Sequence, residues 1–89
     1  MQTHHIIVKG KVQGVFFRAT AKKEATSLGL VGWVKNTSAG DVEIVVSGSK
    51  DKLEVFEAWC ATGPLQAKVD HVKITAVANE QFENFKILK

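Results

Sequence analysis

The stretch Gly10-Lys11-Val12-Gln13-Gly14-Val15-Phe16-Phe17-Arg18 joins the first predicted strand to the first predicted helix. The strand is predicted over Thr3 to Gly10, because the run Ile6-Ile7-Val8 is β-branched and typical of a strand buried on at least one face. Beyond the stretch, apolar residues recur at helical spacing and lysines occupy the opposite side. These apolar residues are Phe17, Ala21, Ala25 and Leu28. Gly29 is a natural stop for this helix.

Four more strands and one more helix are predicted downstream. Leu30 to Asn36 and Asp41 to Ser47 are joined by the turn-forming residues 37–40, which predicts a hairpin. A second helix opens at residues 48–51 and ends at Gly63-Pro64. The last two strands are predicted over Lys68 to Val77 and Phe82 to Leu88.

The second helix carries an apolar stripe and an expected cap at its start. Leu53, Phe56 and Cys60 lie on one side of it, so Cys60 is expected to be a buried small hydrophobe. Asp51 and Glu54 have the spacing of a capping box, in which two side chains satisfy free amides at the helix start.

The predicted order of elements is therefore β-α-β-β-α-β followed by a short final strand. Because strand-helix-strand crossovers are right-handed, this order predicts an α+β fold, the ferredoxin-like α/β sandwich. Both helices are expected on one face of a mainly antiparallel sheet. The strands at Thr3 to Gly10 and Asp41 to Ser47 are expected at its centre.

Length and composition restrict the chain to one ordinary globular domain over residues 1–89. Of 89 residues, 45% are hydrophobic and 24% charged. The only cysteine, Cys60, cannot form an internal disulfide, and residues 1–5 lack the features of a signal peptide. No apolar run approaches membrane-spanning length. We expect a cytoplasmic, monomeric protein that makes no membrane contact.

The charge balance favours a small anionic ligand. The net charge is +3 and the isoelectric point is near 9.2. That excess is too weak and too dispersed to indicate nucleic acid.

The loop between the first strand and the first helix is a possible anion site. Backbone amides at a helix N-terminus are free to bind anions, and the helix dipole adds partial positive charge. Arg18 adds a planar cation suited to phosphate oxygens. Taken alone, Gly10 and Gly14 match neither the dinucleotide fingerprint nor the P-loop spacing, and a plain strand-to-helix turn remains an alternative.

Two longer motifs decide between these alternatives. Residues Val12-Gln13-Gly14-Val15-Phe16-Phe17-Arg18 and Leu28-Gly29-Leu30-Val31-Gly32-Trp33-Val34-Lys35-Asn36 resemble the two signatures of the acylphosphatase family. The resemblance continues at Gly40-Asp41-Val42-Glu43, Gly48, Gly63-Pro64 and residues 82–87, so it covers nearly the whole chain. The fold of that family is the ferredoxin-like sandwich.

The resemblance implies hydrolysis of the carboxyl-phosphate bond of acyl phosphates, giving a carboxylate and inorganic phosphate. Arg18 and Asn36 are then the catalytic residues, with Arg18 on the phosphate and Asn36 orienting the water. Loop amides bind the phosphoryl group. The substrate-binding residues expected from the motif are Gln13, Gly14, Val15, Phe16, Phe17 and Arg18. Neither a metal nor a cofactor is expected.

The residue types around the loop agree with such a substrate. No histidine, carboxylate or cysteine accompanies the motif to act as a general acid. A carboxylate leaves without acid assistance because its conjugate acid has a pKa of about 4, whereas an alkoxide would need a proton.

Two rival functions remain. RNA-recognition domains share this topology, but they need stacking aromatics on the central strands, and residues 6–9 and 42–46 contain none. A non-catalytic domain that binds an anion or another chain through the same loop would need no water-orienting amide such as Asn36.

The other notable residues are expected to be structural. His4 and His5 should point to opposite faces of their strand and lie at the surface, which argues against joint metal binding. His71 is solitary. Gly32 shares a strand face with Asn36, and its small size is expected to leave Asn36 reachable.

Overall fold

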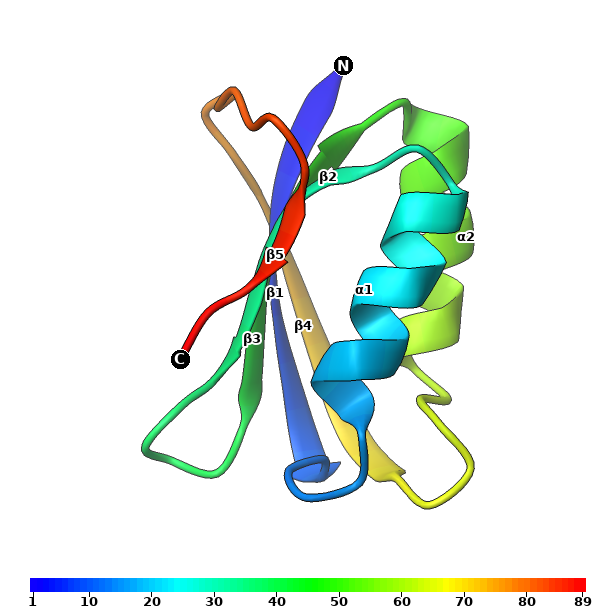
Figure 1. Ribbon diagram of the computed structural model, residues 1–89, viewed down its shortest axis with the longest axis vertical. Helices are drawn as coiled ribbons and strands as arrows, with labels where there is room; N and C mark the ends of the chain where they lie inside the picture. Colours follow the sequence, from blue (N-terminus) through cyan, green and yellow to red (C-terminus); the bar gives the residue numbers. More distant parts are fainter.

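Five strands form one sheet, and both helices pack on the same face of it (Figure 1). The computed structural model describes residues 1–89. In chain order the elements are β1 (Gln2–Lys11), α1 (Phe17–Ser27), β2 (Val31–Asn36), β3 (Val42–Gly48), α2 (Lys50–Cys60), β4 (Lys68–Val77) and β5 (Phe85–Ile87).

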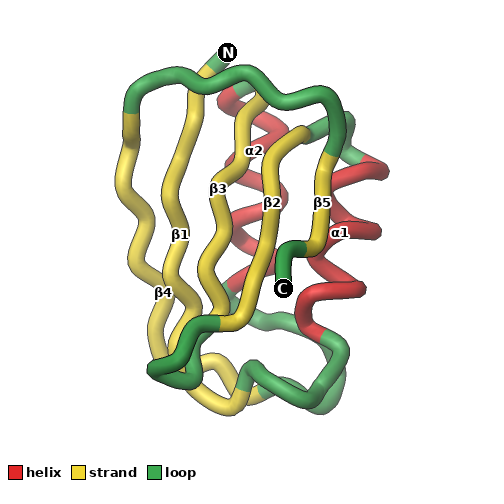
Figure 2. Tube along the Cα trace, turned by 60° about the vertical axis from the view of Figure 1, so that its left-hand side comes forward, coloured by secondary structure: helices red, strands yellow, loops and turns green.

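The strands lie in the order β4-β1-β3-β2-β5, as Figure 2 shows face on. β1 is antiparallel to β3 and β4, β2 is antiparallel to β3, and only β5 runs parallel to its neighbour β2. The predicted ferredoxin-like α+β fold is confirmed, with β1 and β3 inside the sheet as expected. This order sets the start of α1 beside the end of β2, where the motif residues lie.

The core lies between the sheet and the helices. In β1, Ile6 and Val8 are completely buried, because alternate side chains of that strand face the helices. The stripe predicted for the second helix is confirmed, since Leu53, Phe56 and Cys60 of α2 are buried. In the first helix Phe17, Ala21 and Ala25 are buried as predicted, whereas Leu28 lies at the C-cap and is only partly buried. Burying a large apolar side chain contributes roughly 1.5–3 kcal/mol, so these stripes fix both helices on the sheet.

The final strand is shorter than predicted. Residues 82–88 were expected to be extended, but β5 covers only Phe85–Ile87. It pairs with Gly32, Trp33 and Val34 alone, and a bend precedes it. The pairing partner rather than the alternation of side chains sets its length, because an edge strand persists only where a neighbour accepts its hydrogen bonds.

The predicted capping box at the second helix is wrong. α2 begins at Lys50 with Ser49 as its N-cap, and no side chain makes a cap hydrogen bond there. Asp51 therefore lies inside the first turn instead of at the cap position. The hydroxyl of Ser49 holds the pKa of the Asp51 carboxyl below its ordinary value.

The two adjacent histidines point to opposite faces of β1, as predicted, but both are half-buried rather than free at the surface. His4 contacts Glu57 of α2 through Nδ1, and the Nε2 atom of His5 lies 2.7 Å from Glu43 of β3. Each ring therefore joins β1 to a neighbouring element.

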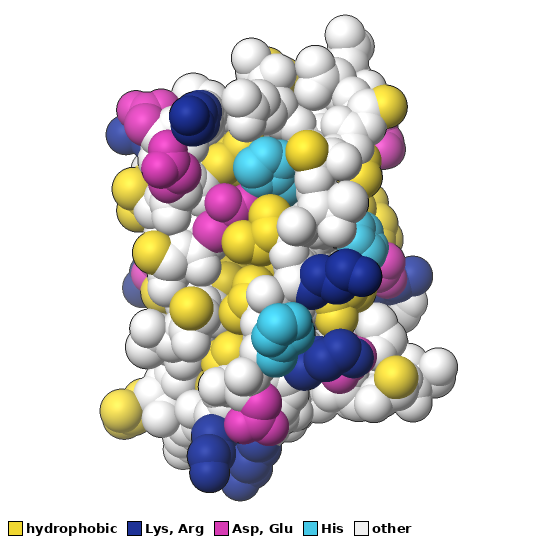
Figure 3. Space-filling view, turned by 180° about the vertical axis from the view of Figure 1, so that it is seen from behind, with side chains coloured by type: hydrophobic (Ala, Val, Ile, Leu, Met, Phe, Trp, Pro, Cys, Tyr) yellow, Lys and Arg dark blue, Asp and Glu magenta, His cyan; other side chains and the backbone are white.

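The helices leave part of the sheet uncovered. On the back of the molecule, opposite to the view of Figure 1, apolar side chains show between charged ones (Figure 3). Ile74 of β4 is 43% exposed although it lies opposite the buried Ile6, because α2 packs mainly over β3.

Candidate active site

The loop from Val12 to Phe16 turns the chain sharply from β1 into α1. Gly14 has φ 73° and Phe16 has φ 65°, so both lie in the left-handed region. A Cβ at Gly14 would meet no atom within 4 Å, so its backbone angle rather than lack of space requires glycine there. Phe16 is the one residue other than glycine with a positive φ, and such strain is concentrated at functional sites.

The amides of this loop have no partner within the protein. None of the backbone hydrogen bonds outside helices and strands is donated by residues 13–18, and no side chain accepts one from them. The amides of Phe17 and Arg18 belong to the first turn of α1, where no intrahelical acceptor exists. Together with the helix dipole, free amides of this kind can bind an anion.

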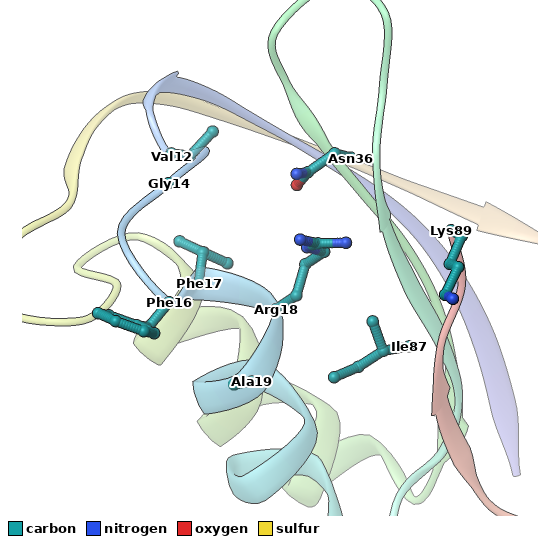
Figure 4. A pocket seen from close by; sticks show the side chains of 9 residues that line it. All are labelled: Val12, Gly14, Phe16, Phe17, Arg18, Ala19, Asn36, Ile87 and Lys89. Atoms are coloured by element: carbon teal, nitrogen blue, oxygen red, sulfur yellow. The ribbon is translucent and has the colours of Figure 1, made fainter.

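Arg18 and Asn36 line one open cavity of about 530 Å³. In Figure 4 the Arg18 side chain rises from α1 toward Asn36, which comes from the end of β2. Val12, Gly14, Phe16, Phe17, Ala19, Ile87 and Lys89 complete the lining. The structure thus brings the two predicted catalytic residues together from separate elements.

Asn36 lines this cavity and carries one unsatisfied polar atom. Its Oδ1 atom is buried and has no hydrogen-bond partner, and no other buried side-chain atom in the protein is left in this state. Buried polar atoms are almost always paired, so an orphaned acceptor calls for an explanation. A water molecule held against Oδ1 would supply the missing donor.

The predicted binding residues do not all present their side chains to the cavity. Gly14, Phe16, Phe17 and Arg18 line it, whereas Gln13 and Val15 do not. The Val15 side chain is 4% exposed and belongs to the core. Gln13 turns its side chain toward the β2–β3 hairpin.

Gly32 is required by its packing against the neighbouring strand. It lies two residues before the buried Val34 in β2, and it does not line the cavity. Its φ is 143°, and a Cβ there would lie 1.9 Å from the carbonyl oxygen of Val45 on β3. Close approach of the β3 backbone is therefore a sufficient reason for glycine at this position, and the expected effect on access to Asn36 stays a prediction.

Sequence reasoning missed the wall of the cavity formed by Ile87 and Lys89. Both follow from the parallel pairing of β5 with β2, which places the end of the chain beside Asn36. The residues carry no local signal for this position, since only the pairing of distant strands creates it.

The charges at the site favour an anion. Arg18 forms no ion pair with any carboxylate, no acidic side chain lines the cavity, and Lys89 adds a second cation. No group of three or more histidine, cysteine, aspartate or glutamate side chains is placed to hold a metal.

Burial raises the pKa of the Cys60 thiol, which is consistent with a packing role. Fold and site together define a small α+β domain with an open, positively charged cavity at the start of α1.

Comparison with known proteins specifies the class further. A family model described as Acylphosphatase matches residues 4–87. An acylphosphatase from Coxiella burnetii (strain RSA 493 / Nine Mile phase I) is 45% identical over 83 residues, covering 93% of this chain and 87% of the relative. One from Methylococcus capsulatus is 39% identical and covers 100% of this chain and 98% of the relative. The crystal structure of acylphosphatase from Bacillus subtilis superposes with a TM-score of 0.97 at 37% identity, with both chains fully covered.

The chain belongs to the acylphosphatase family. Its activity is that of an acylphosphatase, a hydrolase that acts on small-molecule acyl phosphates. None of its helices has the length and apolar character needed to cross a membrane.

Proposed function

We propose that the acyl phosphate binds with its phosphoryl group against the loop amides of residues 13–18 and the guanidinium of Arg18, while Asn36 orients the attacking water. The free amides and the unpaired cation support the first assignment. The amides and the guanidinium would stabilise the negative charge of the bound phosphate. In the transition state this charge spreads over the equatorial oxygens of the phosphoryl group.

The observation that carries the proposal is the orphaned Oδ1 atom of Asn36. Asn36 lines the same cavity as Arg18, and its unpaired Oδ1 atom can accept a hydrogen bond from one water molecule. A water held there is positioned beside a phosphate bound at Arg18. Positioning of this kind converts a collision between two molecules into a reaction within one complex.

The reaction needs no acid from the protein. Water oxygen forms a bond to phosphorus, and the bond from phosphorus to the acyl oxygen breaks, with its electron pair leaving on the carboxylate. The water proton passes to an oxygen of the substrate's own phosphate, since no aspartate, glutamate or histidine side chain lines the cavity. The products are a carboxylate and inorganic phosphate. Neither a metal nor a cofactor takes part.

A comparison of leaving groups tests this mechanism. Benzoyl phosphate releases a carboxylate of low pKa, whereas glycerol phosphate would release an alkoxide that needs protonation. We expect phosphate release from benzoyl phosphate and none above background from glycerol phosphate. Similar rates with both would show that the site supplies a proton to the leaving group. Binding of phosphate without hydrolysis of benzoyl phosphate would instead indicate the non-catalytic anion-binding domain.

We also infer that the protein acts in the cytoplasm as a monomer. The single buried cysteine supports the first inference. Sedimentation velocity tests the second, and a stable dimer would overturn it.

A further inference from the structure

The side chain of Gln13 connects the phosphate loop to the hairpin that carries Asn36. Its Nε2 atom donates one hydrogen bond to the carbonyl oxygen of Thr37 and one to that of Asp41, each at 2.9 Å. A primary amide has two N–H donors, and Gln13 uses both on this single hairpin. Gln13 is half-buried, so both bonds are partly shielded from water.

The two accepting carbonyls close the hairpin directly after Asn36. Thr37 follows Asn36 in the chain, and its amide donates to the carbonyl of Asp41 at 2.9 Å. The amide of Asp41 in turn donates to the hydroxyl of Thr37 at 3.1 Å. Fixing both carbonyls therefore fixes the end of β2, where Asn36 pairs with Val42 of β3.

One other side chain from β1 or the loop makes a polar contact with residues 37–41 of the hairpin, and that contact is an ion pair. Lys9 of β1 forms an ion pair with the carboxylate of Asp41 at 2.8 Å, and its side chain is 52% exposed. Exposed ion pairs contribute little, and this one starts from β1 rather than from the phosphate loop. Gln13 alone joins the loop itself to the backbone beside Asn36.

We propose that Gln13 is a positioning residue that sets the distance between the bound phosphate and the water on Asn36. The inference rests on the proposed function, because it requires Asn36 to orient the water. Phosphate would be held by the loop amides and Arg18, and the water by Asn36. The two groups belong to segments that are joined here only through the Gln13 amide.

The expected consequence is a loss of turnover without a matching loss of phosphate binding. A displacement of about 1 Å between reacting groups costs on the order of 100-fold in rate. Gln13→Met keeps the length of the side chain and removes both donors. We expect kcat for benzoyl phosphate to fall about 10-fold or more, while the inhibition constant of inorganic phosphate changes less than about threefold.

Two further variants sharpen the test. Gln13→Glu removes the donors and turns a negative charge toward two carbonyl oxygens, so its kcat should fall further than that of Gln13→Met. Lys9→Met is the matched control, because it removes the other contact to the same hairpin, and it should keep kcat within about twofold. Circular dichroism establishes that each variant is folded, and Gln13→Glu replaces Gln13→Met if the latter is unfolded.

The decisive measurement is a double-mutant cycle with Asn36→Ala. If Gln13 acts through Asn36, adding Gln13→Met to Asn36→Ala should lower kcat less than about twofold further. An equal fall of kcat in both backgrounds would overturn the proposal, as would a rise in the phosphate inhibition constant equal to the loss of kcat. If Asn36→Ala by itself leaves kcat unchanged, the water-orienting role fails instead, which separates the two outcomes.

Discussion

The guanidinium of Arg18 and the amide of Asn36 face one cavity from the first turn of α1 and the last residue of β2. Arg18 has no carboxylate partner, and the Oδ1 atom of Asn36 has no hydrogen-bond partner at all. Two residues that line one cavity thus each carry a polar group without a partner in the protein. Four of the following predictions concern this site and its loop.

Arg18→Ala should lower kcat/KM for benzoyl phosphate by about 10³-fold or more, the scale of other phosphoryl-transfer arginines. Arg18→Lys should restore little of this loss, because an ammonium group cannot make two parallel hydrogen bonds to phosphate oxygens. Steady-state kinetics on both variants checks the prediction. Near-native turnover of the lysine variant would show that the planar guanidinium group of Arg18 is not required.

Asn36→Ala should lower kcat by about 100-fold or more, the scale of one positioned catalytic hydrogen bond. Because Oδ1 has no partner, its removal should leave the free energy of unfolding unchanged or higher. Kinetics and urea unfolding on the same variant test both effects. Asn36→Asp should also raise the substrate dissociation constant, since its charge faces the phosphate. A raised KM with unchanged kcat in Asn36→Ala would make the residue a binding contact.

Hydrolysis should not depend on a divalent metal. The cavity lining contains neither carboxylate, histidine nor cysteine, so it offers no usual metal-ligand side chain. Activity should persist in EDTA, and inorganic phosphate should inhibit competitively because product and substrate share the loop. Loss of activity in EDTA with recovery on adding Mg²⁺ would contradict this. Inhibition by phosphate that excess substrate cannot relieve would place the phosphate elsewhere.

Phe16→Gly should raise the free energy of unfolding by up to about 1 kcal/mol, because the residue sits at φ 65°, which glycine adopts without strain. Little packing is lost, since Phe16 is 74% exposed. Phe16→Ala is the matched control, as it removes the ring but keeps the Cβ that causes the strain. Urea unfolding of the three proteins provides the comparison. A glycine variant less stable than the alanine variant would show that the loop is not strained there.

Glu43→Gln should change how stability depends on acid pH. A hydrogen bond from His5, with a further contribution from Lys35, holds the pKa of the Glu43 carboxyl below its ordinary value of 4.5. The folded-state pKa is thus the lower one, so this stabilisation is present above pH 4.5 and is lost as the pH falls through the folded-state pKa.

Urea unfolding at a series of pH values between neutral and about 3 measures this effect. The wild type should exceed Glu43→Gln most at the upper end of the series and approach it at the lower end. Glu54→Gln, at an exposed residue of α2 outside every ion pair, is the control. A constant difference between wild type and Glu43→Gln across the series would refute the linkage.

Much of the architecture followed from local pattern in the sequence. The β-branched run of β1 and the apolar stripes of α1 and α2 predicted which faces are buried, because side-chain periodicity is fixed by backbone geometry. The resemblance of two motifs to a known family indicated Arg18 and Asn36 as site residues. The two motifs end in Arg18 and Asn36, whose side chains suit the binding of phosphate and of water.

Other features depend on contacts between residues distant in the chain. β5 stops at Ile87 because β2 offers it only three pairing positions, and the same pairing brings Ile87 and Lys89 to the cavity. Gly32 is required by the carbonyl of Val45 on a neighbouring strand. Neither the length of β5 nor the requirement for glycine at position 32 can be predicted from the neighbouring residues in the sequence. Both depend on which strands become neighbours in the sheet.

The sequence by itself determined the elements, the buried faces and the two polar residues of the site. Only the tertiary structure decided that the Oδ1 atom of Asn36 stays unpaired beside Arg18, and that Gln13 uses its amide to hold the intervening hairpin. The physical reason is that periodicity specifies which way a side chain points from its own strand or helix. What that side chain meets depends on loop closure and strand pairing across the whole chain.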